Sequence, residues 1–328
     1  MRLNFTNGYY EGDVVCGKPH GSGMLRLNDG TQYTGAFFQG VFHGYGFLVM
    51  NGSKYDGEFK NGKRHGHGHW VQSNGDLYDG NMVEDKYSGY GKYVGANNSF
   101  CYEGNWSNNQ MSGQGKLRYT DGAVYEGAFF CGKRCGNGIC TYSNGAVYDG
   151  EWRDDQWNGH GVYTLSNGIK CEEEWENGES DCDEYHVTFP DGRYFEGSID
   201  LATGEVYDYG TMEYPEGDLR KQYNGDFVNS LPDGKGAMFY KDGSFYDGEW
   251  RKGKRDGNGT MTCAGTHDIY SGEWYNDMPD GEGQYVATSW TFTGDFRKGL
   301  NARGVYTDIA GKDHNGRLVD GKFVPDED

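Results

Sequence analysis

The sequence predicts an all-β protein: an elongated single antiparallel sheet, or β-meander solenoid, of about 14 hairpin repeats. Three observations predict it. Glycine accounts for 57 of the 328 residues, a Tyr-x-Gly triplet recurs roughly every 23 residues, and Asn-Gly or Asp-Gly pairs recur at a similar spacing. The best-preserved triplets are anchored by Gly12, Gly35, Gly57, Gly80, Gly104, Gly127, Gly150, Gly225, Gly248 and Gly272.

The triplet is predicted to lie on a strand because a second aromatic residue usually stands two positions beyond its glycine. Alternate residues of a strand share a face, so Tyr148, Gly150 and Trp152 are expected on one side. The intervening Asp149 and Glu151 then point the other way. We therefore expect a polar face toward water and an aromatic face toward the interior.

A second strand is predicted from a Gly-x-Gly motif that follows the anchor glycine, as Gly136 and Gly138 follow Gly127. Glycines inside a strand often mark a close approach of other atoms to the backbone. Aromatic rings of the first strand are expected to lie across both glycines, where a Cβ would clash.

Tight turns are predicted at the Asn-Gly and Asp-Gly pairs, which favour positive φ and are strong hairpin signals. Each repeat is therefore one hairpin joined to the next by another tight turn. The pairs are Asp29-Gly30, Asn51-Gly52, Asn74-Gly75, Asp121-Gly122, Asn144-Gly145, Asn167-Gly168, Asp191-Gly192 and Asp242-Gly243.

This pattern, Tyr-x-Gly-x-Trp/Phe followed by Gly-x-Gly, resembles the MORN (membrane occupation and recognition nexus) repeat over roughly residues 9–323. The resemblance implies an elongated, twisted sheet whose trough is lined by aromatic side chains and binds a partner. An alternative interpretation is that these side chains only pack on glycines. The trough candidates are Tyr102, Trp106, Tyr125, Phe129, Tyr148 and Trp152.

Departures from the pattern divide the chain into an N-terminal array (1–170), a junction of degenerate acidic repeats (171–218) and a C-terminal array (219–328). The junction also holds much of the net charge of −20. It is interpreted as a solvated, flexible joint, a docking site for a basic partner, or a calcium site, although it lacks the EF-hand pattern. The docking candidates are Glu172, Glu173, Glu174, Glu176, Asp181, Asp183 and Glu184.

Other classes of function find little support in the sequence. The acidic charge opposes nucleic-acid binding, and neither a signal peptide nor a long apolar run is visible, so an intracellular protein is expected. His65, His67 and His69 alternate on a predicted strand, but the repeat accounts for His65 and we expect no metal. Catalytic motifs are missing and the repeats leave no room for a catalytic domain, so we expect neither catalysis nor a cofactor.

Basic residues recur in the loops before Gly-x-Gly and could capture anionic lipid headgroups. Acidic neighbours and the overall charge argue against this interpretation. These lipid-binding candidates are Lys63, Arg64, Lys133, Arg134, Arg251, Lys252, Lys254 and Arg255.

The leading hypothesis is a noncatalytic scaffold that binds a helical or extended, possibly basic, segment of another protein. The resemblance implies a cytoskeletal setting: the axoneme of a cilium or flagellum, radial spokes included, a basal body or a cortical skeleton. The alternative is a peripheral membrane module that binds phosphoinositides through the basic loops. Self-association into a homodimer is a further possibility, because an open sheet has edge strands that can pair with another chain.

Overall fold

The computed structural model describes residues 1–180 and 184–326. These residues form 30 β-strands and one short 3-10 turn, η1 (Ala96–Asn98), with no α-helix among them. The chain forms two compact units. Unit 1 comprises Met1–Tyr163 and Glu174–Glu179, and unit 2 comprises Thr164–Glu173 and Ser180–Asp328.

Unit 1 contains the strands β1 (Arg2–Phe5), β2 (Gly8–Val15), β3 (Lys18–Leu27), β4 (Gln32–Phe38), β5 (Val41–Met50), β6 (Ser53–Lys60), β7 (Lys63–Val71), β8 (Leu77–Val83), β9 (Lys86–Val94), β10 (Phe100–Ser107), β11 (Gln110–Tyr119), β12 (Val124–Phe130), β13 (Lys133–Thr141), β14 (Val147–Arg153) and β15 (Gln156–Thr164). Thr164, the last residue of β15, belongs to unit 2, and residues of both units contribute to β16 (Lys170–Glu176) and β17 (Glu179–Ser180).

Unit 2 contains the strands β18 (Tyr185–Thr188), β19 (Tyr194–Ile199), β20 (Val206–Glu213), β21 (Arg220–Val228), β22 (Leu231–Tyr240), β23 (Phe245–Arg251), β24 (Lys254–Thr262), β25 (Ile269–Tyr275), β26 (Met278–Ala287), β27 (Trp290–Phe296), β28 (Ala302–Thr307), β29 (Asp313–Val319) and β30 (Lys322–Pro325).

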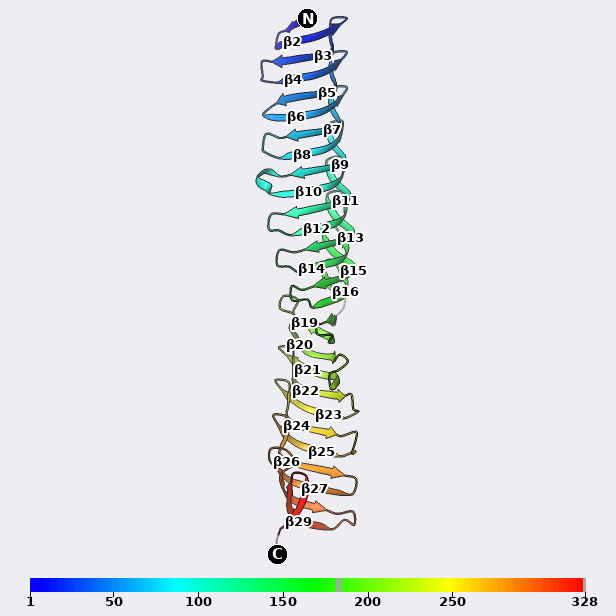
Figure 1. The fold of residues 1–328 in the computed structure, drawn as a ribbon, viewed down its shortest axis with the longest axis vertical. Helices are drawn as coiled ribbons and strands as arrows, with labels where there is room; N and C mark the ends of the chain where they lie inside the picture. Colours follow the sequence, from blue (N-terminus) through cyan, green and yellow to red (C-terminus); the bar gives the residue numbers. More distant parts are fainter. Residues whose placement is uncertain (181–183, 327–328) are drawn as a thin grey trace. The chain divides into compact units, whose positions relative to one another are not determined.

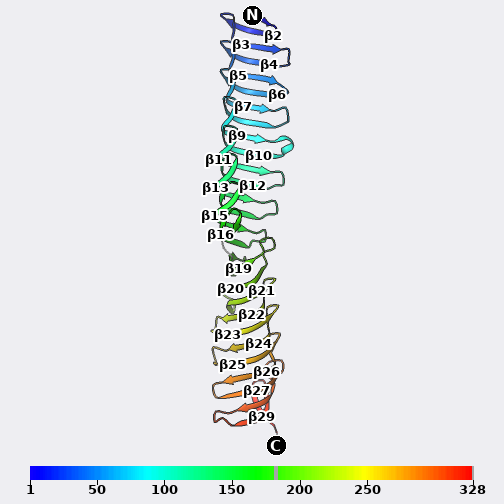
Figure 2. The same ribbon diagram turned by 180° about the vertical axis from the view of Figure 1, so that it is seen from behind.

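Within each unit the strands form an antiparallel meander, in which a strand pairs with its neighbours in sequence (Figures 1 and 2). In unit 1, β12 pairs with β11 on one side and β13 on the other. In unit 2, β23 pairs in the same way with β22 and β24. The predicted all-β meander of hairpin repeats is confirmed.

The core of each unit is a ladder of aromatic rings on one face of the sheet. The Tyr125 ring meets Phe129 of its own repeat edge-on at 5.1 Å and Trp152 of the next repeat at 5.2 Å. Residues between these positions are more exposed, as for Glu126 on β12. The expected arrangement, aromatic inside and polar outside, is confirmed for these strands.

Only the second glycine of Gly-x-Gly has the role that the sequence predicts. A Cβ at Gly138 would lie 2.3 Å from the Tyr125 hydroxyl, so the ring occupies the space that a side chain needs. Gly136 instead adopts a φ of 55°, which places it in the left-handed region. It lies where the register between β12 and β13 shifts, so its role is to form a β-bulge.

The Asp-Gly turns differ in geometry from the second kind of turn in each repeat. At Asp121-Gly122 only the glycine has positive φ, and the Asp121 carboxylate accepts a bond from the Ala123 N–H. Between β14 and β15, by contrast, Asp154 and Asp155 both have positive φ, at 49° and 71°. The positive φ pair of a type I′ turn therefore occurs here without a glycine, and it also occurs at the predicted Asn51-Gly52, where φ is 51° and 77°.

Several of these turns are also bonded to the repeat before them. The Asp155 N–H donates to the Arg134 carbonyl at 3.2 Å, and the Gly132 N–H donates to the Met111 carbonyl at 2.9 Å. These bonds run between turns about one repeat apart in sequence, so they tie consecutive hairpins together at their tips.

Candidate functional site

The six trough candidates lie on the aromatic face of unit 1, and all six side chains are buried. Tyr102 is fully buried, and Trp106, the most exposed of them, retains 8% of its surface. The Tyr102 hydroxyl donates to the Asn105 carbonyl at 2.9 Å, and the Trp106 indole N–H donates to the Gly91 carbonyl at 3.1 Å. Burial raises the pKa of Tyr102 to about 12. Packing on glycines accounts for these contacts, and a partner-binding role for the six stays a prediction.

A depression of about 520 Å³ lies beside this core on unit 1. Of the six candidates, only Trp106 lines it. The apolar and aromatic lining residues besides Trp106 are Trp70, Tyr87, Tyr93, Phe100 and Met111, and the polar ones include Gln72, Asp85, Asn109 and Gln110. Most of the aromatic residues in this set stand outside the consensus positions of the repeat, which is why the repeat pattern missed them.

Ring contacts and hydrogen bonds hold the aromatic lining in place. Tyr87 stacks on Tyr78 at 3.9 Å, and Tyr93 stacks on Phe100 at 5.2 Å. The Tyr87 hydroxyl accepts a bond from the Gln72 amide at 2.8 Å, and burial raises the pKa of Tyr87 to about 12. The depression is therefore lined by neutral, preformed rings.

A second depression of about 370 Å³ shares Trp70 and Asp85 with the first. Its other lining residues include Phe42, Leu48, Met50, Tyr55, Phe59 and Arg64. We call the two together the aromatic depressions. They provide adjacent apolar surfaces on one face of unit 1.

An arginine lies at the boundary between the aromatic depressions. The Arg64 Nε is 2.8 Å from the Asp85 carboxylate, and the guanidinium lies 3.7 Å from the centre of the Trp70 ring. Both the ion pair and the stacking hold the arginine in one orientation.

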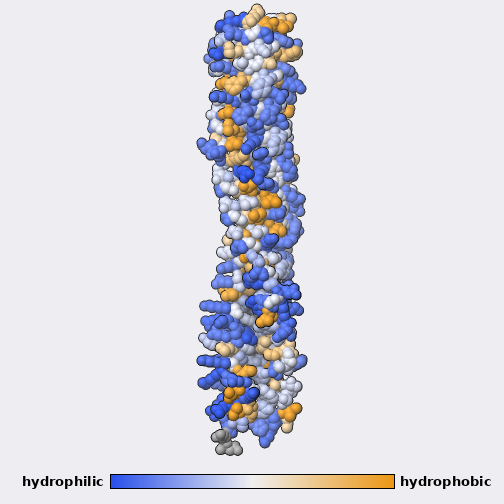
Figure 3. Space-filling model, viewed as in Figure 1, coloured by the Kyte–Doolittle hydropathy of each residue, from blue (hydrophilic) through white to orange (hydrophobic). Residues whose placement is uncertain are grey.

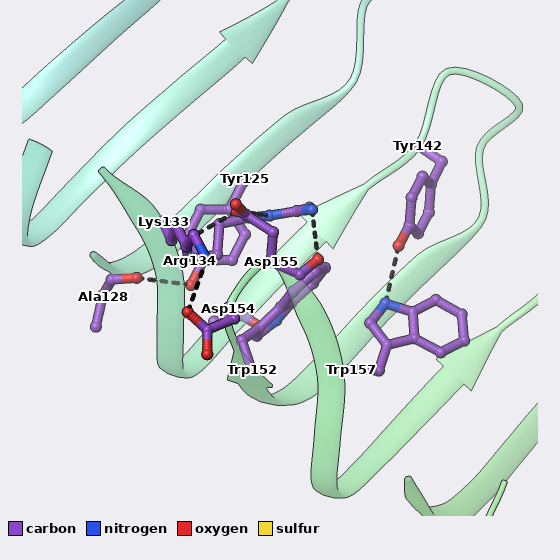
Figure 4. Close-up of polar contacts among 10 residues, drawn as sticks. Tyr125, Ala128, Lys133, Arg134, Tyr142, Trp152, Asp154, Asp155 and Trp157 are labelled. Carbon is purple, nitrogen blue, oxygen red and sulfur yellow. Dashed lines mark hydrogen bonds and ion pairs between the residues drawn. The ribbon is translucent and has the colours of Figure 1, made fainter. Parts of the chain in front are cut away.

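The same arrangement recurs twice. Figure 4 shows it at Arg134, whose Nε is 3.0 Å from Asp155 and whose guanidinium lies 4.1 Å from the Trp152 ring. In unit 2, Arg255 pairs with Asp277 at 3.2 Å. We call this Arg–Asp pair over an indole the arginine clamp.

The arginine clamps involve three of the lipid-binding candidates: Arg64, Arg134 and Arg255 keep only 17%, 17% and 19% of their side-chain surface. Lys63 and Lys133 pair with Glu84 and Asp154. The remaining candidates are exposed: Arg251, Lys252 and Lys254. Lipid binding by the set stays a prediction, with most of its charge already paired.

The acidic docking candidates fall in both units. Glu172, Glu174, Glu176 and Glu184 are exposed, whereas the Glu173 side chain keeps only 1% of its surface. Its carboxylate accepts a bond from the His186 N–H. Asp181 and Asp183 lie outside the described residues. Docking at these carboxylates stays a prediction.

Two of the three alternating histidines meet at one carboxylate. His67 Nε2 is 3.3 Å and His69 Nδ1 is 3.2 Å from the two oxygens of Asp79. Across residues 1–180 and 184–326, no group of three or more His, Cys, Asp or Glu side chains is placed to hold a metal ion.

The sequence profile of the MORN repeat matches more than half of the chain. The matched segments are residues 10–32, 33–51, 55–77, 78–100, 102–124, 125–147, 148–170, 223–245, 246–265 and 270–291. The chain belongs to the MORN repeat family. The aromatic depressions are thus built by MORN repeats of unit 1, and the degenerate junction lies between matched segments.

Resemblance to characterised proteins is more limited. ALS2 C-terminal-like protein of Bos taurus is 41% identical over 46 residues, which are 14% of this chain and 5% of that protein. The TCP10 domain of Danio rerio CPAP, solved with a peptide of STIL, is 11% identical with a TM-score of 0.34, over 74% of this chain and 93% of that one. The TCP domain of Drosophila melanogaster SAS-4, solved with a proline-rich motif of Ana2, is 11% identical with a TM-score of 0.30, over 54% and 84%. Scores this low do not establish a shared fold.

In the part of the chain that the structure describes, no helix combines the length and the apolar character needed to span a bilayer.

Proposed function

We propose that this MORN-repeat protein is a noncatalytic scaffold that binds a helical or extended segment of a partner protein in the aromatic depressions of unit 1. The first depression, with its preformed rings and a volume of about 520 Å³, carries the proposal. That volume falls within the range of ligand sites, and apolar lining with a few polar groups is typical of them.

The paired depressions favour a peptide over a small molecule. Because they share Trp70 and Asp85, two apolar side chains of one segment can occupy them side by side. Recognition by spaced apolar anchors is typical of helices and strands bound in grooves. The fixed guanidinium of Arg64 between the depressions offers a polar contact that orients the segment.

Site-specific crosslinking tests the surface. A photoreactive amino acid at Met111, in the first depression, should form a crosslink to one partner peptide in cells, and Phe100→Asp should abolish it. Phe130→Asp is the matched control, because Phe130 is 69% exposed and lines neither depression. Equal loss of the crosslink in both variants would contradict binding at the depressions.

We further propose a cytoskeletal setting, an axoneme of a cilium or flagellum, a basal body or a cortical skeleton, on the basis of the MORN family. Cells with the tagged protein, extracted with nonionic detergent, should retain it in the insoluble skeleton. Release together with membrane lipids would instead favour the phosphoinositide alternative.

A further inference from the structure

Three arginines surround a hollow of about 620 Å³ on unit 2, far in sequence from the aromatic depressions. Arg303 on β28 stands directly opposite Arg317 on β29, and Arg297 follows β27. Asp295, Asn301, Ala302, Leu318, Val319 and Asp326 complete the lining.

The opposed arginines are costly for the sheet. Like charges directly opposite each other on antiparallel strands are destabilising. The Arg317 side chain makes no hydrogen bond or ion pair within the described residues, and Arg297 pairs with Asp295 at 3.2 Å. In a chain with a net charge of −20, an unpaired guanidinium beside a second one is an unsatisfied site for an anion.

The chain itself places one carboxylate in this hollow. An Asp326 oxygen lies 3.7 Å from Arg303 Nη2, which is an ion-pair distance but too long for a hydrogen bond. The Asp326 N–H donates to the Asn315 carbonyl, so the backbone of Asp326 continues the pairing of β30 with β29. A peptide carboxylate on an extended backbone is therefore the kind of group that reaches the arginines.

We propose that the hollow binds an acidic peptide segment of a partner protein, whose carboxylates contact Arg303 and Arg317 after displacing Asp326. With Asp326 displaced, the three arginines face only Asp295 among the acidic lining residues. The excess of two positive charges matches a segment with two neighbouring carboxylates. This site is separate from the aromatic depressions, so the protein would hold two partner segments at once.

Fluorescence anisotropy with the full-length protein tests the site. The probe is a fluorescein-labelled peptide with two adjacent aspartates between Gly and Ser residues, and the reference peptide has asparagines in their place. Arg317→Gln should weaken binding of the aspartate peptide about fivefold, the upper range for one partly exposed charge pair. Arg251→Gln, which removes an exposed arginine of β23, should leave it unchanged.

A second pair of variants separates displacement of Asp326 from a general effect of charge. Asp326→Asn should strengthen binding of the aspartate peptide about twofold, because the competing carboxylate is removed. Asp320→Asn removes the same charge from a nearby turn that does not line the hollow, and should have no effect. Equal strengthening by both variants would overturn the proposal.

Folding and ligand class are controlled in the same experiment. Arg317→Gln should not lower the melting temperature, because it relieves repulsion between opposed charges. Equal affinity for the asparagine peptide would overturn the proposal. The proposal would also be overturned if the aspartate peptide does not bind while phosphoinositide vesicles or inorganic phosphate bind in a manner that depends on Arg317.

Discussion

At the scale of single residues, one tyrosine and one glycine recur as a pair in most repeats. The Tyr125 ring covers Gly138, and its hydroxyl donates to the Ala128 carbonyl at 3.1 Å. The ring thus gains both apolar burial and a partner for its only polar atom. Where phenylalanine takes this position, as at Phe195, burial of the ring is kept without the hydrogen bond.

Gly138→Ala should destabilise unit 1 by at least about 2 kcal/mol, because the new methyl group would overlap the Tyr125 ring. Gly265→Ala is the matched control, since its Cβ would meet no atom within 4 Å. Chemical denaturation monitored by tryptophan fluorescence gives both values. Similar losses for the two variants would show that the ring moves aside freely.

The tyrosine core predicts loss of stability in alkaline solution. Burial raises the pKa of Tyr33 and Tyr102 to about 12, above the ordinary value near 10. Between these values the folded state keeps protons that the unfolded state loses, so stability falls as pH rises. The melting temperature should be steady below about pH 10 and should drop between about pH 10 and 12. A steady melting temperature up to pH 12 would contradict this assignment.

The sequence predicted the pairing of a core tyrosine with a glycine, such as Tyr125 with Gly138. Aromatic residues two positions apart share a face of their strand, and a glycine on the next strand leaves room for the ring. It did not predict the role of Gly136, since the sequence does not distinguish a glycine that forms a β-bulge from one that makes room for a ring. Nor did it predict Trp70 or Tyr87, because the residue type at their repeat positions varies: the place opposite the core tyrosine is Trp70 in one repeat and Leu117 in another. The available sequence signal for the lining of the depressions was the presence of aromatic residues at positions outside the repeat consensus.

At the scale of the hairpin, the type I′ turns combine strain with a compensating contact. Asp155 has a left-handed φ of 71°, and its carboxylate accepts bonds from the Arg134 backbone and side chain, both at 3.0 Å. Gly132 holds the same place in another hairpin without strain. The Asn-Gly rule identified a turn with positive φ at both residues at Asn51-Gly52, whereas at Asn144-Gly145 only the glycine has positive φ. It did not identify Asp154-Asp155, because that turn contains no glycine.

Asp155→Ala should cost about 1 kcal/mol more than Asp155→Gly, because only glycine relieves the left-handed strain. Both substitutions lose the same carboxylate contacts with Arg134, so the difference isolates the backbone. Thermal or chemical unfolding of the two variants measures it. Identical losses would mean that the turn relaxes to another conformation.

At the scale of the whole molecule, each unit is a series of strands that contact their sequence neighbours. Stability in such repeats is approximately a sum of intrinsic and nearest-neighbour contributions. The chain divides into two units around residues 163–180, a stretch in which the MORN match ends at residue 170. The three-part division at residues 170 and 218 stays a prediction. Figure 3 shows that hydrophobic residues also reach the surface, in small separate patches.

Local damage should therefore remain local. In Gly138→Ala, hydrogen exchange should accelerate in β12–β14 of unit 1, while β23–β25 of unit 2 keep their protection. Mass spectrometry of proteolytic fragments after exchange provides the measurement. Faster exchange throughout both units would show that the chain unfolds as one cooperative body.

The glycines that pair across neighbouring strands also affect how the coding sequence can gain or lose repeats. Gly127 lies opposite Gly138 on one side of a hairpin, and Gly138 lies opposite Gly150 of the next. Hairpins that keep both glycines, such as these, thus offer their successors the same bare backbone that they received from their predecessors. An in-frame duplication of about 23 codons, or their loss, joins two surfaces that already fit. Unequal recombination can therefore change the number of repeats without requiring a new interface to evolve.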